Sequence, residues 1–323
     1  MATTKIGLTL SSEEHGPADL VDLAVEAEAR GFDFVSVSDH FHPWLTAQGH
    51  SPFVWGVLGA IAARTERIEV GVGVTCPILR MHPAIVAHAA ATAGCLLEGR
   101  FTFGVGTGEA LNEHVTGERW PPADLRLEML EEAIEVMRDL WTGESVTRRG
   151  THFTVENATL HDLPTEPFPL VVSAFGPAAA RLAAEKGDGL WTTGTGEDAV
   201  QEWHDAGGSG PVWSQLTFRW DPDERAARER AAELWANTAV PGQLSQDLPT
   251  SLHFEQGSAH VDADNIAEHT PCGPDPEPII EAVASAAQAG VDHVYLHQIG
   301  HDLGPFLDYW TDSLAEQVRG ALR

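Results

Sequence analysis

The stretch KIGLTLSSEEHGPADLVDLAVEAEARGFDFVSV, residues Lys5–Val37, decides the fold class of this chain. Its residues Ile6–Leu10 predict a strand. Apolar side chains at the spacing of one helix face then fill Pro17–Arg30, and Gly31 suits the position just after a helix end. A second buried strand is predicted at Phe34–Val37. Strand, helix and strand in this order are typical of a parallel sheet.

The same alternation continues along all 323 residues. Further strands are predicted at 68–74, 100–105, 170–174, 189–192, 212–220 and 293–297, and the clearest helical segments at 52–64, 83–97, 123–141, 276–289 and 306–322. Two insertions interrupt the pattern, one at about 145–160 that reads as a hairpin and one at about 238–270 without clear periodicity. Eight strand units without a linker predict a single (β/α)8 (TIM) barrel domain over 1–323. An open, doubly wound sheet is the alternative, because periodicity does not show closure.

The charge balance disfavours several partners. Asp and Glu number 48 against 19 Lys and Arg, which gives a formal net charge of −29. So acidic a chain repels nucleic acid and anionic membranes, and we expect neither as a partner. Few lysines and many acids suit a halophilic protein, although an acidic protein from a GC-rich genome would look similar. The chain shows neither a secretion signal nor a long apolar run, so we expect a soluble, cytoplasmic protein.

Metal binding and disulfide formation are not indicated by the sequence. The three cysteines, Cys76, Cys95 and Cys272, are far apart and form no C-x-x-C pair. Sixteen histidines are present without an H-E-x-x-H or similar ligand pattern. We therefore expect no metal site.

Polar side chains follow the ends of several predicted strands, where a barrel carries its active site. Asp39, His40 and Trp44 follow the strand at 34–37, and they combine an acid, an imidazole and an indole. Other polar or glycine-rich strand ends carry Glu13, Thr107, Glu109, Asn112, Phe175-Gly176-Pro177 and Thr192–Thr195. Such a set suits a general base and acid that face a planar or polyhydroxylated ligand.

Structural roles remain open for each of these residues. In a purely structural interpretation, His40 is a core histidine and Trp44 is a packing residue. Glu109 and Asn112 are then helix caps. The glycines of 104–108 lack the G-x-G-x-x-G spacing of nucleotide-binding turns and instead suggest close approach of the backbone to a ligand. Gly176 precedes a helix whose first amides either bind a phosphate or form a plain turn.

Three segments in one order resemble the luciferase-like flavin and deazaflavin oxidoreductases. Within that family they look like the branch that uses coenzyme F420, a 5-deazaflavin, and that contains glucose-6-phosphate dehydrogenases and a secondary-alcohol dehydrogenase. The segments are SDHFHPW (38–44), VTCPILR with PAIVA (74–80 and 83–87), and GVGTGEALNE (104–113). The family fold is a (β/α)8 barrel with insertions, in agreement with the strand count.

The resemblance implies that F420 lies across the barrel mouth. The residues expected to contact the deazaflavin are Asp39, Gly73, Val74, Cys76, Thr107, Gly108 and Asn112. The phosphate of the coenzyme tail is expected at Ala174, Phe175 and Gly176. The family also has a non-proline cis peptide at the bulge of the third strand, here Gly73–Val74.

Catalytic roles also follow from the resemblance. His40 would accept the proton of the substrate hydroxyl as hydride leaves carbon, and Glu109 would act as the acid partner near the ring. Trp44 would shape the substrate pocket, and Glu13 matches a further acid of that pocket. A 5-deazaflavin favours hydride transfer, so the protein must add a base, orientation and exclusion of water.

The sequence departs from the sugar-phosphate enzymes where they clamp the phosphate. Two lysines and an arginine do so in that branch, and here the matching places hold Thr195, a segment 241–262 without lysine, and a position near His269. Losing three cations removes several charge-assisted hydrogen bonds. We therefore expect a neutral hydroxyl substrate, a free sugar or secondary alcohol, with Thr195, His260 and His269 near it.

Three other functions remain open from the sequence. They are an F420-dependent sugar-6-phosphate dehydrogenase, an FMN-dependent luciferase-like monooxygenase, and a coenzyme-binding protein without catalysis. The resemblance also suggests a homodimer.

Overall fold

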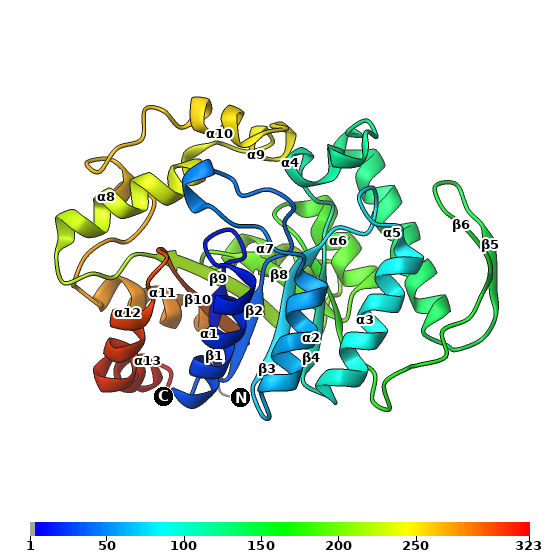
Figure 1. Cartoon of the computed structure of the whole chain (residues 1–323), viewed down its shortest axis with the longest axis horizontal. Helices are drawn as coiled ribbons and strands as arrows, with labels where there is room; N and C mark the ends of the chain where they lie inside the picture. Colours follow the sequence, from blue (N-terminus) through cyan, green and yellow to red (C-terminus); the bar gives the residue numbers. More distant parts are fainter. Residues whose placement is uncertain (1–3) are drawn as a thin grey trace.

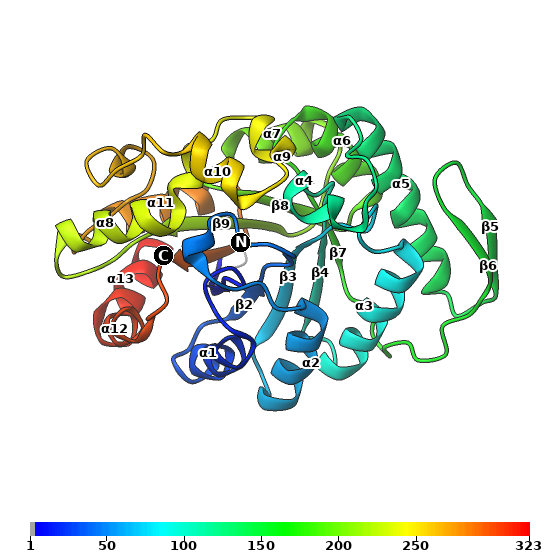
Figure 2. The same ribbon diagram turned by 45° about the horizontal axis from the view of Figure 1, so that its top comes forward.

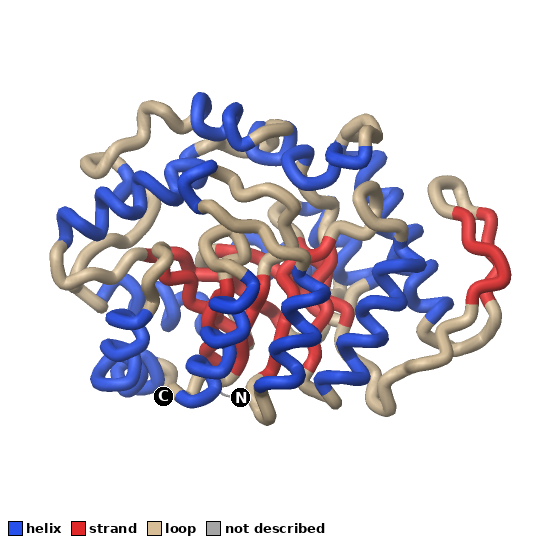
Figure 3. Tube along the Cα trace, in the orientation of Figure 1, coloured by secondary structure: helices blue, strands red, loops and turns tan. Residues whose placement is uncertain are grey.

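The computed structural model describes residues 4–323 as a closed barrel of parallel strands surrounded by helices (Figures 1 and 3). Around the barrel the strands follow the order β1, β2, β3, β4, β7, β8, β9 and β10, and β10 pairs with β1. Their bounds are β1 (Lys5–Leu10), β2 (Phe34–Val37), β3 (Glu69–Thr75), β4 (Phe101–Val105), β7 (Leu170–Ser173), β8 (Gly189–Thr193), β9 (Val212–Phe218) and β10 (His293–Gln298). The closed order confirms the predicted barrel and excludes the open, doubly wound sheet.

Helices cover the outside of the barrel and bury their apolar faces against it. In α1 (Pro17–Ala29) the buried side chains are Leu20, Val21, Ala24 and Ala27, the face that the sequence pattern predicts. The other helices of the outer layer are α2 (Val54–Arg64), α3 (Pro83–Leu97), α5 (Ala123–Leu140), α6 (Pro177–Lys186), α7 (Glu197–Asp205), α11 (Glu277–Gln288), α12 (Gly304–Tyr309) and α13 (Ala315–Ala321). By contrast, α8 (Glu224–Trp235) packs against the 3-10 turns of the second insertion. A π-helical turn at Trp310–Leu314 joins α12 and α13, so the predicted closing helix at 306–322 is interrupted.

Aromatic side chains close the interior of the barrel below its mouth. Trp191 of β8 stacks on Trp213 of β9 with ring centroids 4.8 Å apart, and its indole N–H donates to the hydroxyl of Tyr295. Glycines on the facing strands make room for these rings, since a methyl group on Gly73 would lie 2.2 Å from Trp191 Cζ2. Phe34 completes this aromatic floor. A ligand can therefore occupy only the upper part of the barrel.

The bulge of the third strand has the predicted backbone geometry. The peptide bond Gly73–Val74 is cis, and the register between β3 and β4 shifts between Val72 and Thr75. Both Gly73 and Val74 are partly exposed, whereas the strand before them is buried. This bulge thus presents bare backbone to the mouth of the barrel.

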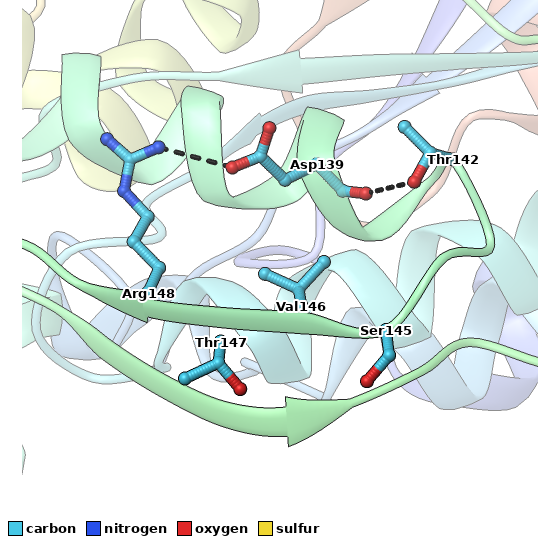
Figure 4. Close-up of a pocket in the computed structure, with 6 residues that line it drawn as sticks. All are labelled: Asp139, Thr142, Ser145, Val146, Thr147 and Arg148. Carbon is cyan, nitrogen blue, oxygen red and sulfur yellow. Dashed lines mark hydrogen bonds and ion pairs between the residues drawn. The ribbon is translucent and has the colours of Figure 1, made fainter.

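The first insertion forms the predicted hairpin of β5 (Val146–Arg149) and β6 (Thr154–Ala158), which stands beside α5 on the outer side of the barrel (Figure 1). Glu132 of α5 accepts three backbone N–H groups of the hairpin turn, at residues 151–153. A surface hollow of about 400 Å3 lies between β5 and the end of α5 (Figure 4). It is lined by Asp139, Thr142, Ser145, Val146, Thr147 and Arg148, and its position away from the strand ends separates it from the candidate site.

The second insertion covers the end of the barrel opposite the two chain termini (Figures 1 and 2). We call residues 236–270 the roof segment. It contains two short helices, α9 (Leu244–Asp247) and α10 (Ser251–Gly257), and 3-10 turns at Ala236–Ala239 and Ile266–Glu268. The sequence pattern did not predict these helices, because four to seven residues are too few to show a helical repeat.

Candidate active site

His40 lies between two carboxylates at the mouth of the barrel. Its Nδ1 is 3.2 Å from Glu13 Oε1, and its Nε2 is 3.9 Å from Glu109 Oε2. The geometry along the shorter line does not meet that of a hydrogen bond, so Nδ1 and the Glu13 carboxylate are in close contact without a straight hydrogen bond. The structure therefore brings together three residues from the ends of three strands, as the sequence predicts, with Nε2 of the imidazole on the side of Glu109.

Glu13 is fixed by neighbouring hydroxyls rather than by a cation. Its Oε2 accepts hydrogen bonds from Ser11 Oγ and Ser38 Oγ, both at 2.8 Å. This leaves Oε1 directed at His40. Because the Glu13 side chain is only 3% exposed, it faces the imidazole with little competition from water. Glu13 thus places a buried carboxylate oxygen beside His40, an arrangement that the sequence did not specify.

Asn112 holds the loop that carries His40. Its Oδ1 accepts the backbone N–H groups of Phe41 (2.8 Å) and His42 (3.0 Å), and its Nδ2 donates to Glu109 Oε2 at 3.2 Å. Glu109 is the N-cap residue of α4 (Ala110–Glu113), yet its side chain accepts no capping hydrogen bond. The carboxylate therefore points toward His40 and does not serve as a plain cap.

Asp39 belongs to a buried network that joins three loops. Its carboxylate accepts hydrogen bonds from Thr75 Oγ1 at 2.7 Å and from Arg80 Nη2 at 2.9 Å. Arg80 also contacts Glu113, whose Oε2 accepts the backbone N–H of Arg80 at 2.9 Å. Burial raises the pKa of Glu113 to about 7, although the nearby guanidinium opposes the rise. Arg80 and Glu113 were not predicted as site residues. The sequence signal that could have identified Arg80 was its position shortly after a strand end in a chain with few basic residues.

Trp44 packs under the roof segment. Its ring meets His40 edge-on at 5.1 Å between centroids and Phe254 of α10 at 4.9 Å. The roof segment is fastened to the same loop, because Ser251 Oγ donates to Pro43 O and Glu255 accepts the N–H of Thr46. Trp44 thus has both a packing contact and a face next to the imidazole.

The predicted cofactor contacts on β3 and β4 lie side by side. Thr107 and Gly108 are partly exposed, like Gly73 and Val74 on the neighbouring strand. Cys76 is buried beneath them, and a methyl group on Gly108 would lie 2.6 Å from its Sγ. Burial raises the pKa of the Cys76 thiol, so it stays uncharged.

The predicted phosphate residues begin α6. Ala174 is buried, Phe175 is 64% exposed, and Gly176 is the N-cap residue. As a glycine, the N-cap residue has no side chain that could cap the helix, and Pro177 follows it at the first helical position. The free amides of this first turn are suited to an anion.

Among residues 4–323, no hydrogen bond or ion pair joins the three predicted substrate residues to His40. His260 and His269 are exposed in the roof segment, and Thr195 is partly exposed in the turn after β8. The hydrogen bond recorded at His260 involves its backbone O, which accepts from Asn265. The neighbouring Val261, by contrast, packs in the same apolar cluster as Trp44.

A second acid–imidazole pair lies at the mouth and was not predicted. Glu14 Oε2 is 2.9 Å from His297 Nε2, and Glu14 Oε1 accepts the N–H of Gly300 at 2.7 Å. His297 Nδ1 lies 3.2 Å from Thr217 Oγ1, which accepts a hydrogen bond from Gln215 Nε2 at 3.1 Å. The partners are up to 286 residues apart in the chain, so the sequence gives no local signal for them.

Among residues 4–323, no group of three or more His, Cys, Asp or Glu side chains is arranged to hold a metal ion. Over the same residues, no helix has both the length and the apolar character needed to cross a membrane. The three cysteines are free thiols.

The sequence of residues 1–293 matches the family model described as luciferase-like monooxygenase. The chain belongs to the luciferase-like family. Curated relatives extend over the whole chain: an F420-dependent glucose-6-phosphate dehydrogenase of Rhodococcus hoagii is 36% identical over 98% of both chains. One from Segniliparus rotundus is 37% identical over 98% of both chains.

Solved structures of the family have the same fold. An F420-dependent secondary alcohol dehydrogenase, in complex with an F420-acetone adduct, is 33% identical with a TM-score of 0.89, over 99% of both chains. The coenzyme F420-dependent tetrahydromethanopterin reductase of Methanopyrus kandleri is 22% identical with a TM-score of 0.78, over 98% of this chain and 100% of that chain. The second likeness concerns the fold alone.

Proposed function

We propose that this protein is an F420-dependent dehydrogenase that acts on a CH–OH group of a neutral small molecule, a non-phosphorylated sugar or a secondary alcohol. The observation that carries the proposal is the placement of His40 between Glu13 and Glu109 at the mouth of the barrel. The named relatives, at 33–37% identity over almost the full chain, support the coenzyme.

The residues present fit a deazaflavin. Gly73, Thr107 and Gly108 leave a strip without bulky side chains on which a planar ring can lie, and the first turn of α6 offers amides to a phosphate. When bound, a 5-deazaflavin accepts a hydride from a substrate carbon. The fit therefore concerns both the ring and the tail of the coenzyme.

His40 Nε2 accepts the hydroxyl proton while the C–H bond breaks, so the substrate leaves as a carbonyl compound. Glu13 lies 3.2 Å from the opposite nitrogen, and its negative charge stabilises the imidazolium that forms. Glu109 is 29% exposed and can deliver a proton toward the ring. Trp44 and the roof segment exclude water from the reacting atoms.

The roof segment argues against a phosphorylated substrate. It contains no Lys or Arg, and its acids are Asp247, Glu255, Asp262, Asp264 and Glu268. The nearest arginine on α5, Arg126, is 1% exposed and already donates to Pro121 O and Gln246 Oε1. A phosphate here would find acids without a free cation. Sugar-6-phosphate oxidation is the second candidate, because the curated relatives carry that name.

The test is a screen of free sugars, sugar phosphates and secondary alcohols as substrates. Reduction of F420 is monitored through the loss of its visible absorbance. FMN with oxygen serves as the competing cofactor. We expect turnover with F420 and neutral hydroxyl compounds. His40→Ala should lower kcat at least about a hundredfold while F420 binding survives, and exposed His161→Ala should not change it. Parent-like turnover in His40→Ala would refute the base, and turnover with sugar phosphates alone would refute the neutral substrate.

For the assembly, we propose a homodimer through α2 and α3. Exposed Phe53, Ile85 and Leu96 lie on or next to these adjoining helices, and α3 carries no charged residue. In a chain with a net charge of −29, an uncharged apolar face is where two copies can meet without repulsion. Sedimentation of the parent and of Ile85→Glu tests this, since the variant should sediment as a monomer.

A further inference from the structure

The strands β9 and β10 present polar side chains to the open part of the barrel. Trp213 points inward, because it stacks on Trp191, and strand alternation then turns Gln215 and Thr217 to the same side. Both are partly exposed, whereas Trp213 beneath them is buried. On β10, His297 lies in register with Thr217. We call Gln215, Thr217 and His297 the polar wall.

The hydrogen bonds of the polar wall run in one direction. Burial acts to raise the pKa of Glu14, but the bonds from His297 and Gly300 outweigh it and the pKa lies below its usual value. An ionised Glu14 only accepts, so Nε2 of His297 donates to it, and the other ring nitrogen, Nδ1, is left to pair with the Thr217 hydroxyl. Thr217 in turn accepts from Gln215 Nε2.

This direction decides what the wall offers to a ligand. An amide N–H of Gln215 donates to Thr217, and the carbonyl Oε1 of this partly exposed residue has no protein hydrogen-bond partner within residues 4–323. A second polar atom on this side is also unpaired: Thr9 is 6% exposed, and its Oγ1 has no partner in the described chain. Gln215 Oε1 can therefore accept a hydrogen bond from a ligand, and the Thr9 hydroxyl can either donate or accept one.

The candidate substrates differ in whether they can donate a hydrogen bond to Gln215. A phosphate oxygen is an acceptor, and it would also face the charge of Glu14. A simple secondary alcohol has a single O–H, and His40 takes that proton. A second donor on the same substrate therefore means a second hydroxyl group.

We propose that Gln215, held in place by Thr217, His297 and Glu14, is a specificity-determining residue that accepts a hydrogen bond from a substrate hydroxyl remote from the oxidised carbon. The substrate class is then a neutral polyol, such as a free sugar. This inference rests on the proposed function and narrows it. Trp44, whose ring meets His40, suits the C–H face of such a molecule.

The test compares Gln215→Met, which keeps the length of the side chain but removes the acceptor, with the parent. D-glucose and sorbitol serve as polyols, 2-propanol as the simple alcohol, and F420 affinity is measured by fluorescence. We expect KM for the polyols to rise about tenfold with kcat nearly unchanged, as for the loss of one neutral hydrogen bond. The 2-propanol constants and the Kd for F420 should stay the same.

Two further variants keep the outcome decisive. Gln201→Met, on the exposed side of α7, is the matched control and should behave as the parent. Thr217→Val removes the group that orients Gln215, and it should raise the polyol KM in the same selective way even if Gln215→Met folds poorly.

Each other outcome overturns a stated claim. A weaker Kd for F420 in Gln215→Met would assign the wall to the coenzyme, and equal effects on polyols and 2-propanol would also refute the inference. A parent enzyme that oxidises 2-propanol but no polyol would refute the inference about a polyol substrate and would leave the proposed dehydrogenase function intact. A parent that reduces F420 with none of the hydroxyl compounds refutes the proposed function itself.

Discussion

Replacing Glu113 with glutamine tests how the buried network of Asp39, Arg80 and Glu113 is charged. One guanidinium faces two carboxylates whose side chains are at most 1% exposed. Burial raises the pKa of Glu113 from 4.5 to about 7, Arg80 opposes the rise and Asp39 adds to it. Ionising both acids leaves one negative charge in excess within the network, so the folded chain holds a proton that the unfolded chain releases.

The magnitude follows from this difference in pKa. The stabilisation by the neutral form of Glu113 is complete below the unfolded pKa of 4.5 and is lost as the pH rises through about 7. At about 1.4 kcal/mol per pKa unit, the loss amounts to about 3 kcal/mol. Glutamine resembles the protonated acid and does not titrate. Glu113→Gln should therefore match the parent near about pH 5 and exceed its stability by about 2–3 kcal/mol near about pH 8.5.

The assay is urea unfolding at both pH values, with tryptophan fluorescence as the readout. Glu118→Gln, in the exposed loop that follows, is the matched control and should track the parent at each pH. A Glu113→Gln protein that is less stable than the parent at about pH 8.5, or a difference that does not vary with pH, would show that Glu113 is ionised and paired with Arg80 throughout.

Two further changes test the floor and the loop of the site. Gly73→Ala places a methyl group 2.2 Å from Trp191 and should cost about 1–3 kcal/mol in urea unfolding, whereas Gly59→Ala, with open space around it, should not destabilise. Asn112→Asp keeps the acceptor for the loop amides but sets a carboxylate against Glu109 Oε2, 3.2 Å away. The added negative charge favours the protonated form of the His40 base, so kcat should fall about tenfold at neutral pH and recover in more alkaline buffer; an unchanged pH profile would contradict this.

The barrel was predictable because its signal is local and repeated. Each strand follows a helix of regular period, and the helix at 83–97 has the bounds that the sequence predicts. His40 and Glu109 were also within reach, since both directly follow a strand end. The cis peptide at Gly73–Val74 followed from the family resemblance rather than from the residues alone.

The pairing of buried charged residues could not be predicted from the sequence, because this pairing is not local. Arg80 meets Asp39 across 41 residues and His297 meets Glu14 across 283, and only the closed parallel barrel brings these strand ends together. Nothing in the local sequence marks which acid will be paired. The roof segment shows a related limit: its short helices are held by contacts to other parts of the chain, such as Ser251 to Pro43, and not by a period of their own.

The stacked indoles of Trp191 and Trp213 close the barrel at one end, so that its interior opens to solvent only at the mouth. Whatever enters must leave by the same route, so two occupants cannot pass each other. The molecule seated deeper has to arrive first and depart last, which imposes a compulsory order of addition and release on any two-substrate cycle run in this fold.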